Sequence, residues 1–209
     1  MMLFPDPHQS RPRLECGIDE TGYGSGVAEV YVGCCILDPL RPIQGLADSK
    51  TLTAKRRKVL SDEIKEKALA WSIATASLAE IEQFNVLHAT HLAMARAVAG
   101  LKIKPDLALI DGNRLPPLPI PARAIVKGDA TIPAISAASI IAKVARDEAL
   151  IEYHKVYPQY GFDKHKGYLT PAHLAALKKH GPCPIHRVGY APVRALLAPA
   201  SRMIQAPLL

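Results

Sequence analysis

Aromatic side chains are scarce in this chain of 209 residues, where phenylalanine, tyrosine and tryptophan together make up 5%. Hydrophobic residues still account for 49% of the chain, so its core has to be built from aliphatic side chains. No apolar run is long enough to cross a membrane, and the N-terminus lacks the apolar centre of a signal peptide. We therefore expect one cytoplasmic domain without membrane contact.

Cysteine is also rare, and none of the four cysteines forms a CxxC pair. Cys16, Cys34 and Cys35 lie in apolar runs, which predicts buried thiols in a reducing compartment and argues against a disulfide framework. Cys183 lies near His180 and His186, so a metal site is an alternative there. No fourth ligand lies close by in the sequence, which disfavours it.

Acidic residues are fewer than basic ones: the chain has 26 lysines and arginines but 19 aspartates and glutamates, which gives a net charge of +7 and a pI of about 9.3. This excess favours a polyanionic partner such as nucleic acid, although a basic protein without such a partner is an equal alternative. The run Lys55-Arg56-Arg57-Lys58 has the same two interpretations, a phosphate-contacting patch or a solvated helix face.

The hydrophobic pattern predicts an α/β fold with a mixed central sheet flanked by helices. We expect residues 1–13 to be a flexible leader, residues 14–190 the main folded domain and residues 191–209 a C-terminal helix and tail. Asn85 is expected to break its helix, and Pro133 to lie near the start of the long helix. The predicted strands are 14–18, 30–37, 71–76, 107–110 and 122–126, and the predicted helices are 55–68, 78–100, 135–153, 171–180 and 193–197.

Acidic residues follow three of the predicted strands, as Asp19-Glu20, Asp111 and Asp129. One acid after a strand is common turn chemistry, and this alternative holds for Asp111 taken alone. Three such strand ends are harder to explain as turns, because ligands collect at strand ends in α/β sheets. Four oxygen donors suit Mg²⁺ or Mn²⁺, and two such ions are a means of hydrolysing phosphodiesters.

Seven segments of the chain, in order, resemble those of bacterial ribonuclease HII, the type 2 ribonuclease H, and they span roughly residues 14–190. The resemblance implies a ribonuclease H-like fold and an endonuclease that cuts the RNA strand of RNA–DNA hybrids. It also implies incision 5′ to single ribonucleotides in duplex DNA. The segments are GIDE at 17–20, DSK at 48–50, LHAT at 87–90, IDGN at 110–113, KGD at 127–129, SAASIIAKVARD at 136–147, and YGF at 160–162 with HKGY at 165–168.

The resemblance also assigns the site residues. Its four acids correspond to Asp19, Glu20, Asp111 and Asp129, which are expected to hold two Mg²⁺ or Mn²⁺ ions. Water would be activated by one ion and the 3′-oxygen stabilised by the other, leaving 5′-phosphate and 3′-hydroxyl ends. Tyr168 corresponds to the tyrosine that packs on the sugar after the ribonucleotide. The remaining residues expected to bind substrate are Gly22, Tyr23, Gly24, Lys50, Ser139 and Lys143.

One position departs from the family pattern. Family members follow the acid pair with a Gly-Arg-Gly loop, whose main chain senses the ribose 2′-hydroxyl and whose arginine helps bind the backbone. This chain has Gly22-Tyr23-Gly24 instead, and Glu29 adds a negative charge nearby. Tyrosine lacks the charge and the fork of arginine, so weaker substrate binding is expected.

Two rival functions are compatible with parts of the pattern. An actin-like phosphotransferase would explain Gly17-Ile18-Asp19, although a second phosphate loop is missing. A non-catalytic nucleic-acid-binding module would explain the charge but leaves the four acids unexplained. We expect a monomer, and residues 195–209 show no clear anchor for a clamp protein.

Overall fold

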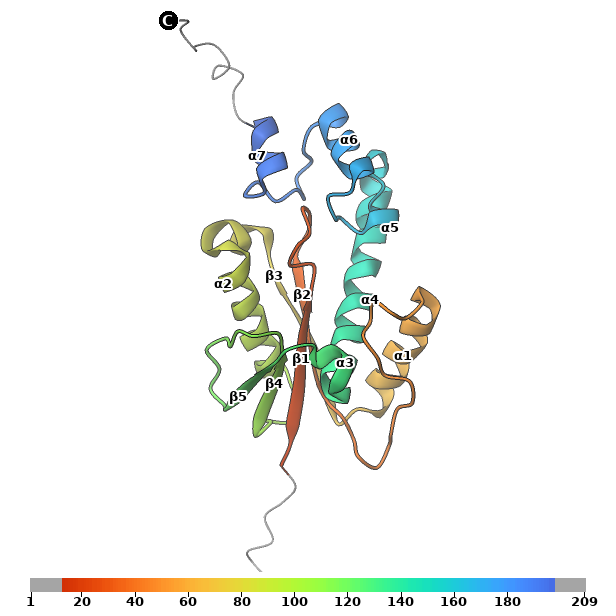
Figure 1. Cartoon of the computed structure of the whole chain (residues 1–209), viewed down its shortest axis with the longest axis vertical. Helices are drawn as coiled ribbons and strands as arrows, with labels where there is room; N and C mark the ends of the chain where they lie inside the picture. Colours follow the sequence, from red (N-terminus) through yellow and green to blue (C-terminus); the bar gives the residue numbers. More distant parts are fainter. Residues whose placement is uncertain (1–12, 198–209) are drawn as a thin grey trace, which may run out of the picture.

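The computed structural model describes residues 13–197, which form a five-stranded mixed sheet with the order β3-β2-β1-β4-β5 (Figure 1). β1 is antiparallel to β2, and β2 is antiparallel to β3, whereas β4 is parallel to both β1 and β5. The expected mixed sheet is therefore confirmed. The strands are β1 (Glu15–Thr21), β2 (Val30–Ile36), β3 (Ala70–Ala76), β4 (Leu107–Asp111) and β5 (Ala122–Ile125).

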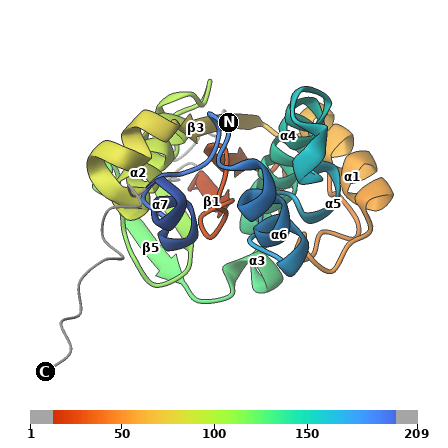
Figure 2. The ribbon, with the colours of Figure 1, turned by 90° about the horizontal axis from the view of Figure 1, so that it is seen from above.

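Helices cover both faces of the sheet, as the view from above shows (Figure 2). α2 (Leu78–Ala99) packs on one face against the aliphatic side chains of β1, β2 and β4. α1 (Ala54–Lys67) and α4 (Pro133–Val156) pack on the other face. Pro133 lies in the first turn of α4, as expected. No helix within the described part of the chain is both long and apolar enough to cross a bilayer.

Glycines let α4 approach the two central strands closely. A Cβ atom at Gly17 would overlap the backbone of Ala134, and one at Gly33 would overlap the carbonyl oxygen of Ala138. Ala137 and Ala138 of α4 are themselves fully buried. The small residues early in this helix therefore serve close packing.

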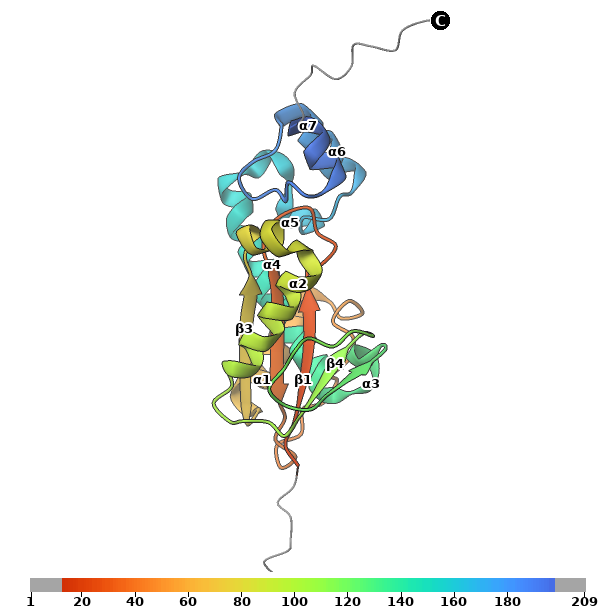
Figure 3. The same cartoon turned by 90° about the vertical axis from the view of Figure 1, so that its left-hand side faces the viewer.

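Helix α2 is kinked at Asn85, where a break was expected (Figure 3). Asn85 has the left-handed φ of 64°, and its side-chain oxygen accepts hydrogen bonds from the backbone N–H groups of Leu87 and His88. It thereby caps the second half of the helix.

The predicted end of the first strand at Ile18 is wrong, because β1 continues to Thr21. Asp19 and Glu20 are paired with Gly33 and Val32 of β2 and so lie inside the strand. Asp111 is likewise the last residue of β4, and only Asp129 follows its strand. The antiparallel partner β2 holds β1 extended beyond the end of β4, which the apolar pattern of β1 alone does not reveal.

The C-terminal part of the described chain is helical. α6 (Pro171–His180) has the predicted bounds, and α7 (Ala191–Leu197) begins two residues before its predicted start. Three short elements were not predicted, because three or four residues carry no periodic pattern. They are α3 (Gly128–Thr131), η1 (Pro158–Tyr160) and α5 (Phe162–His165). The predicted leader, apart from Arg13, and the tail beyond Leu197 lie outside the described residues.

Candidate active site

The four predicted acids meet at one edge of the sheet. The parallel register pairs Ile18 with Ile110, which brings Asp19 beside Asp111. The backbone N–H of Asp129 donates to Asp111 Oδ1 at 3.3 Å, so α3 holds the fourth acid against β4. A cavity of about 270 Å³ opens beside three of them; it is lined by Asp19, Glu20, Tyr23, Leu87, Thr90, His91, Met94, Asp111, Gly112, Asn113 and Arg114.

Burial and mutual repulsion make negative charge costly at this edge. Burial raises the pKa of Asp19 to about 8, and the charges of Asp111 and Glu20 add to the effect. The pKa values of Glu20 and Asp129 are also raised, chiefly by burial. Lys50 Nζ lies 3.9 Å from Asp129, and its side chain is 76% exposed. The charges of Lys50, Arg146 and Arg187 oppose the rise in the pKa of Glu20 without cancelling it. The cluster is thus short of positive charge, which a divalent cation would supply.

The donor set fits a hard divalent cation. All four side chains offer carboxylate oxygens, the ligands that Mg²⁺ and Mn²⁺ prefer. Among residues 13–197, however, no three histidine, cysteine, aspartate or glutamate side chains are already grouped closely enough to hold an ion. The case for a metal therefore depends on donor type and charge. The same finding disfavours the alternative metal site at Cys183, His180 and His186.

The loop that carries Lys50 is held from inside the fold. Ser49 and Ser139 share a hydrogen bond of 2.9 Å between their hydroxyls, and Ser139 also bonds the carboxyl of Asp19. Arg57 Nη1 donates to the carbonyl oxygens of Ser49 and Leu52 at 2.7 and 2.5 Å. The loop is therefore fixed relative to the acids. Sequence reasoning missed this role of Arg57, because the surrounding basic run hides it.

The basic run at residues 55–58 is largely engaged within the protein. Arg57 also lies 3.7 Å from Asp147, Arg56 donates to the carbonyl of Gln44, and Lys58 pairs with Asp62 and Glu148. These contacts favour a structural role over a phosphate-contacting patch. Asp147 also pairs with Lys143, whose Nζ lies 2.7 Å from it. Substrate contact by Lys143 would compete with this ion pair and stays a prediction.

The glycine loop lies directly beside the acids. Glu20 Oε2 accepts a hydrogen bond from the N–H of Tyr23 at 3.1 Å. Gly22 has a φ of 94°, and a Cβ atom there would overlap the side chain of Arg146. The side chain of Tyr23 is 37% exposed. Glu29, the other departure, accepts from the hydroxyl of Tyr153 at 3.2 Å.

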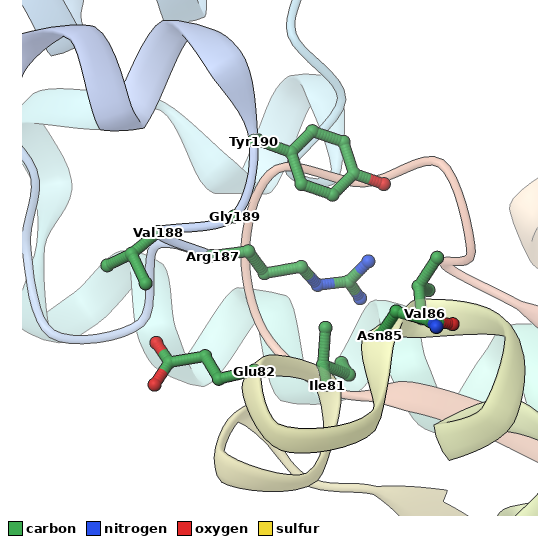
Figure 4. A pocket seen from close by; sticks show the side chains of 8 residues that line it. All are labelled: Ile81, Glu82, Asn85, Val86, Arg187, Val188, Gly189 and Tyr190. Carbon is green, nitrogen blue, oxygen red and sulfur yellow. The ribbon is translucent and has the colours of Figure 1, made fainter.

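Two residues that were not predicted hold the carbonyl of Tyr23. Arg187 Nη1 and the Tyr190 hydroxyl donate to it at 3.0 and 2.7 Å. Both side chains line a cavity of about 340 Å³ beside the kink of α2 at Asn85 (Figure 4). Arg187 is buried, and its Nε donates to the carbonyl of Ala28 at 2.8 Å. A single arginine more than 160 residues away gives no sequence signal for such a contact.

Arg146 joins the glycine loop to the segment that carries Tyr168. Its guanidinium is fully buried, donates to the carbonyl of Lys166 at 3.0 Å and lies 6.0 Å from the ring of Tyr168. A backbone hydrogen bond from Gly26 to Gly167 adds a second link. Tyr168 is 40% exposed. The structure thus brings the predicted substrate residues of both loops to neighbouring positions.

Comparison with known proteins agrees with this geometry. Residues 16–193 match the family model described as Ribonuclease HII. A protein of that name from Desulforamulus reducens is 63% identical over 88% of this chain and 93% of its own length. The crystal structure of ribonuclease H2 from Pyrococcus horikoshii has a TM-score of 0.73 at 26% identity, covering 87% of this chain and 96% of that one.

A second similar structure is Bst-RNase HIII in complex with Mn²⁺, with a TM-score of 0.68. Its identity is 16%, covering 91% of this chain and 71% of that one, so it supports the shared fold alone. The family match and the identity to the curated relative cover most of the sequence. The chain therefore belongs to the ribonuclease HII family, a family of endoribonucleases.

Proposed function

We propose that this protein hydrolyses the RNA strand of RNA–DNA hybrids and incises 5′ to single ribonucleotides in duplex DNA. The observation that carries the proposal is the meeting of four acids with the glycine loop and the exposed Tyr168. Family membership supports ribonuclease H activity and disfavours the phosphotransferase alternative. The expected products carry 5′-phosphate and 3′-hydroxyl ends.

In this mechanism Asp19, Glu20, Asp111 and Asp129 would hold two Mg²⁺ or Mn²⁺ ions. When bound, such ions supply an activated water and neutralise charge on the leaving 3′-oxygen. Ser139 orients the carboxyl of Asp19 by a hydrogen bond, and α3 places Asp129 against Asp111. The pKa of Asp19 is raised by its burial, so a bound cation would also favour its ionised form.

The two loops next to the acids would select the substrate. The main chain of Gly22-Tyr23-Gly24 would meet the ribose 2′-hydroxyl, and the ring of Tyr168 would pack on the following sugar. Lys50 would contact a phosphate, since its side chain is exposed and its loop is fixed. Ser139 lies beside Asp19, and its direct contact with substrate, like that of Lys143, is part of the proposal. We further propose a cytoplasmic monomer.

A duplex with one ribonucleotide, incubated with the protein in Mg²⁺ or in Mn²⁺, tests this function. The expected result is one cut, 5′ to the ribonucleotide, with a 3′-hydroxyl end that a polymerase extends. An RNA–DNA hybrid should be cut at several positions. If neither metal supports cleavage at high enzyme concentration, the binding-only alternative is correct.

Tyr23→Arg is expected to strengthen substrate binding. The backbone N–H and the carbonyl of Tyr23 are both hydrogen-bonded within the protein, so the side chain is the part of this residue left to contact substrate. An added charge-assisted contact to phosphate contributes about 1–3 kcal/mol, so the Michaelis constant on the single-ribonucleotide duplex should fall about tenfold. An unchanged Michaelis constant and turnover would contradict this. Tyr23→Ala is the companion variant, since a severe loss there would show that the ring itself stacks on the substrate.

A further inference from the structure

Two buried histidines and the half-buried Cys183 form a cluster next to Tyr168 that takes no part in the chemistry described above. His173 of α6 and His186 are 0% and 3% exposed, and their Nε2 atoms lie 3.1 Å apart. The aromatic ring of Phe162 packs against both imidazoles.

The backbone fixes the proton positions at both ends of the pair. His173 Nδ1 lies 3.0 Å from the carbonyl oxygen of Tyr168, which only accepts, so this nitrogen carries a hydrogen. His186 Nδ1 lies 2.9 Å from the backbone nitrogen of Cys183, which donates, and 3.3 Å from the carbonyl oxygen of the same residue, which accepts. That carbonyl already accepts from the backbone N–H of His186 at 2.9 Å, so the shorter contact favours a lone pair on Nδ1. The sulfur of Cys183 lies 3.1 Å from the same nitrogen.

These constraints make the central contact complementary when both rings are neutral. His173 then accepts at Nε2, and His186 donates from Nε2. A proton added to His173 would place its Nε2–H against the Nε2–H of His186. A proton added to His186 would place an N–H at Nδ1 against the backbone N–H of Cys183. In this arrangement each ring nitrogen of the two neutral histidines has a complementary partner.

The surroundings also favour neutral rings. Burial lowers the pKa of His173, and burial together with His173 lowers the pKa of His186 from 6.5 to about 4. Protonation is therefore easier in the unfolded chain, and acidification below pH 6.5 works against the folded arrangement. The ionisable groups that face the pair in the described structure are His165 of α5, Tyr160 of η1 and Cys183. None of these is a carboxylate that would stabilise an imidazolium.

We propose that Cys183, His186 and His173 form a neutral hydrogen-bond relay that positions Tyr168 for substrate. The relay ends on the carbonyl of Tyr168, which also accepts from the N–H of Thr170 at 2.8 Å. Its other end belongs to the segment whose Arg187 and Tyr190 hold Tyr23. The histidines are positioning residues, and their effect on catalysis depends on the proposed contact of Tyr168 with the substrate.

Two substitutions of His173 separate positioning from packing. The amide of asparagine lies where Nδ1 was, and it keeps a donor for Tyr168. The amide of glutamine lies where Nε2 was, and it keeps the contact with His186 but loses Tyr168. A purely structural role would affect both variants alike, whereas the relay predicts that their Michaelis constants differ.

His173→Gln is expected to raise the Michaelis constant on a single-ribonucleotide duplex about threefold to tenfold with turnover little changed, because the acids lie elsewhere. His173→Asn should stay within about twofold of the wild type. The exposed His180 supplies the control His180→Gln, expected to match the wild type. Equal Michaelis constants for the two His173 variants, at equal folded fractions, would overturn the proposal.

Nitrogen-15 chemical shifts of the wild-type imidazoles test the relay without activity. At pH 7 they should show the Nδ1–H form of His173 and the Nε2–H form of His186. Any other tautomer, or an imidazolium, would refute the relay even if a variant failed to fold. An inactive wild type with the expected tautomers would instead count against the proposed function alone.

Discussion

Asp111→Asn is expected to slow single-turnover cleavage of a single-ribonucleotide duplex at least about a thousandfold, equivalent to about 4 kcal/mol of transition-state stabilisation. Asparagine retains the side-chain oxygen that accepts from the N–H of Asp129, so the local structure should persist. The substitution removes one negative charge beside Asp19 and Asp129. The loss would therefore reflect weaker cation binding and poorer charge neutralisation, and calorimetric titration with Mn²⁺ should show reduced affinity.

Asp62→Asn is the matched control for this variant. Asp62 is exposed on α1, pairs only with Lys58 in the described structure, and lies outside the acid cluster. Its loss should change the cleavage rate by less than about twofold, because exposed ion pairs contribute little. If Asp111→Asn keeps more than a tenth of the wild-type rate with its fold intact, Asp111 is not a metal ligand in the reaction.

Gly33→Ala is expected to cost at least about 3 kcal/mol of unfolding free energy or to prevent folding. The new methyl group would overlap the carbonyl oxygen of Ala138 in α4, and a helix backbone has little freedom to move away. Separating α4 from the sheet would also disturb Ser139 and the acids that it supports. Urea denaturation followed by circular dichroism measures the change.

Gly189→Ala provides the comparison, because a Cβ atom there meets nothing within 4 Å. Its unfolding free energy should lie within about 0.5 kcal/mol of the wild type. If the unfolding free energy of Gly33→Ala lay within about 1 kcal/mol of the wild-type value, α4 would shift easily on the sheet. The close approach of helix and sheet would then not be what fixes the site.

The sequence predicts the parts of this molecule that local chemistry determines. Aliphatic runs identify the five strands, the polar Asn85 marks the kink of α2, and acids near strand ends identify the candidate site. The local pattern wrongly places Asp19 and Glu20 after the first strand, because the apolar run ends at Ile18. In the structure, pairing with β2 extends β1 beyond its apolar residues. The local pattern also misses α3, whose four residues are too few for a periodic pattern.

The supporting residues could not be predicted for a different reason. The guanidinium groups of Arg57 and Arg187 donate hydrogen bonds to backbone carbonyls. An arginine in a sequence does not indicate which carbonyl it will contact. Arg187 meets the carbonyl of Tyr23 across most of the chain length, so only the folded topology brings the two together. Arg57 lies in a run of like charges that equally describes a solvated surface. The resemblance to the family identifies the acids and Tyr168, but it leaves their supports unassigned.

Helix α4 sets the spacing between the acid cluster and the two loops beside it. Ser139 bonds the carboxyl of Asp19, a proposed metal ligand, and seven residues later Arg146 contacts both loops proposed to bind substrate. At 1.5 Å per residue these supports are about 10 Å apart along one rigid element. One residue inserted between them would turn Arg146 by about 100° away from the loops. In the proposed function, the distance between the acids and the loops that would recognise the sugar is thus set by the number of residues between two positions of one helix.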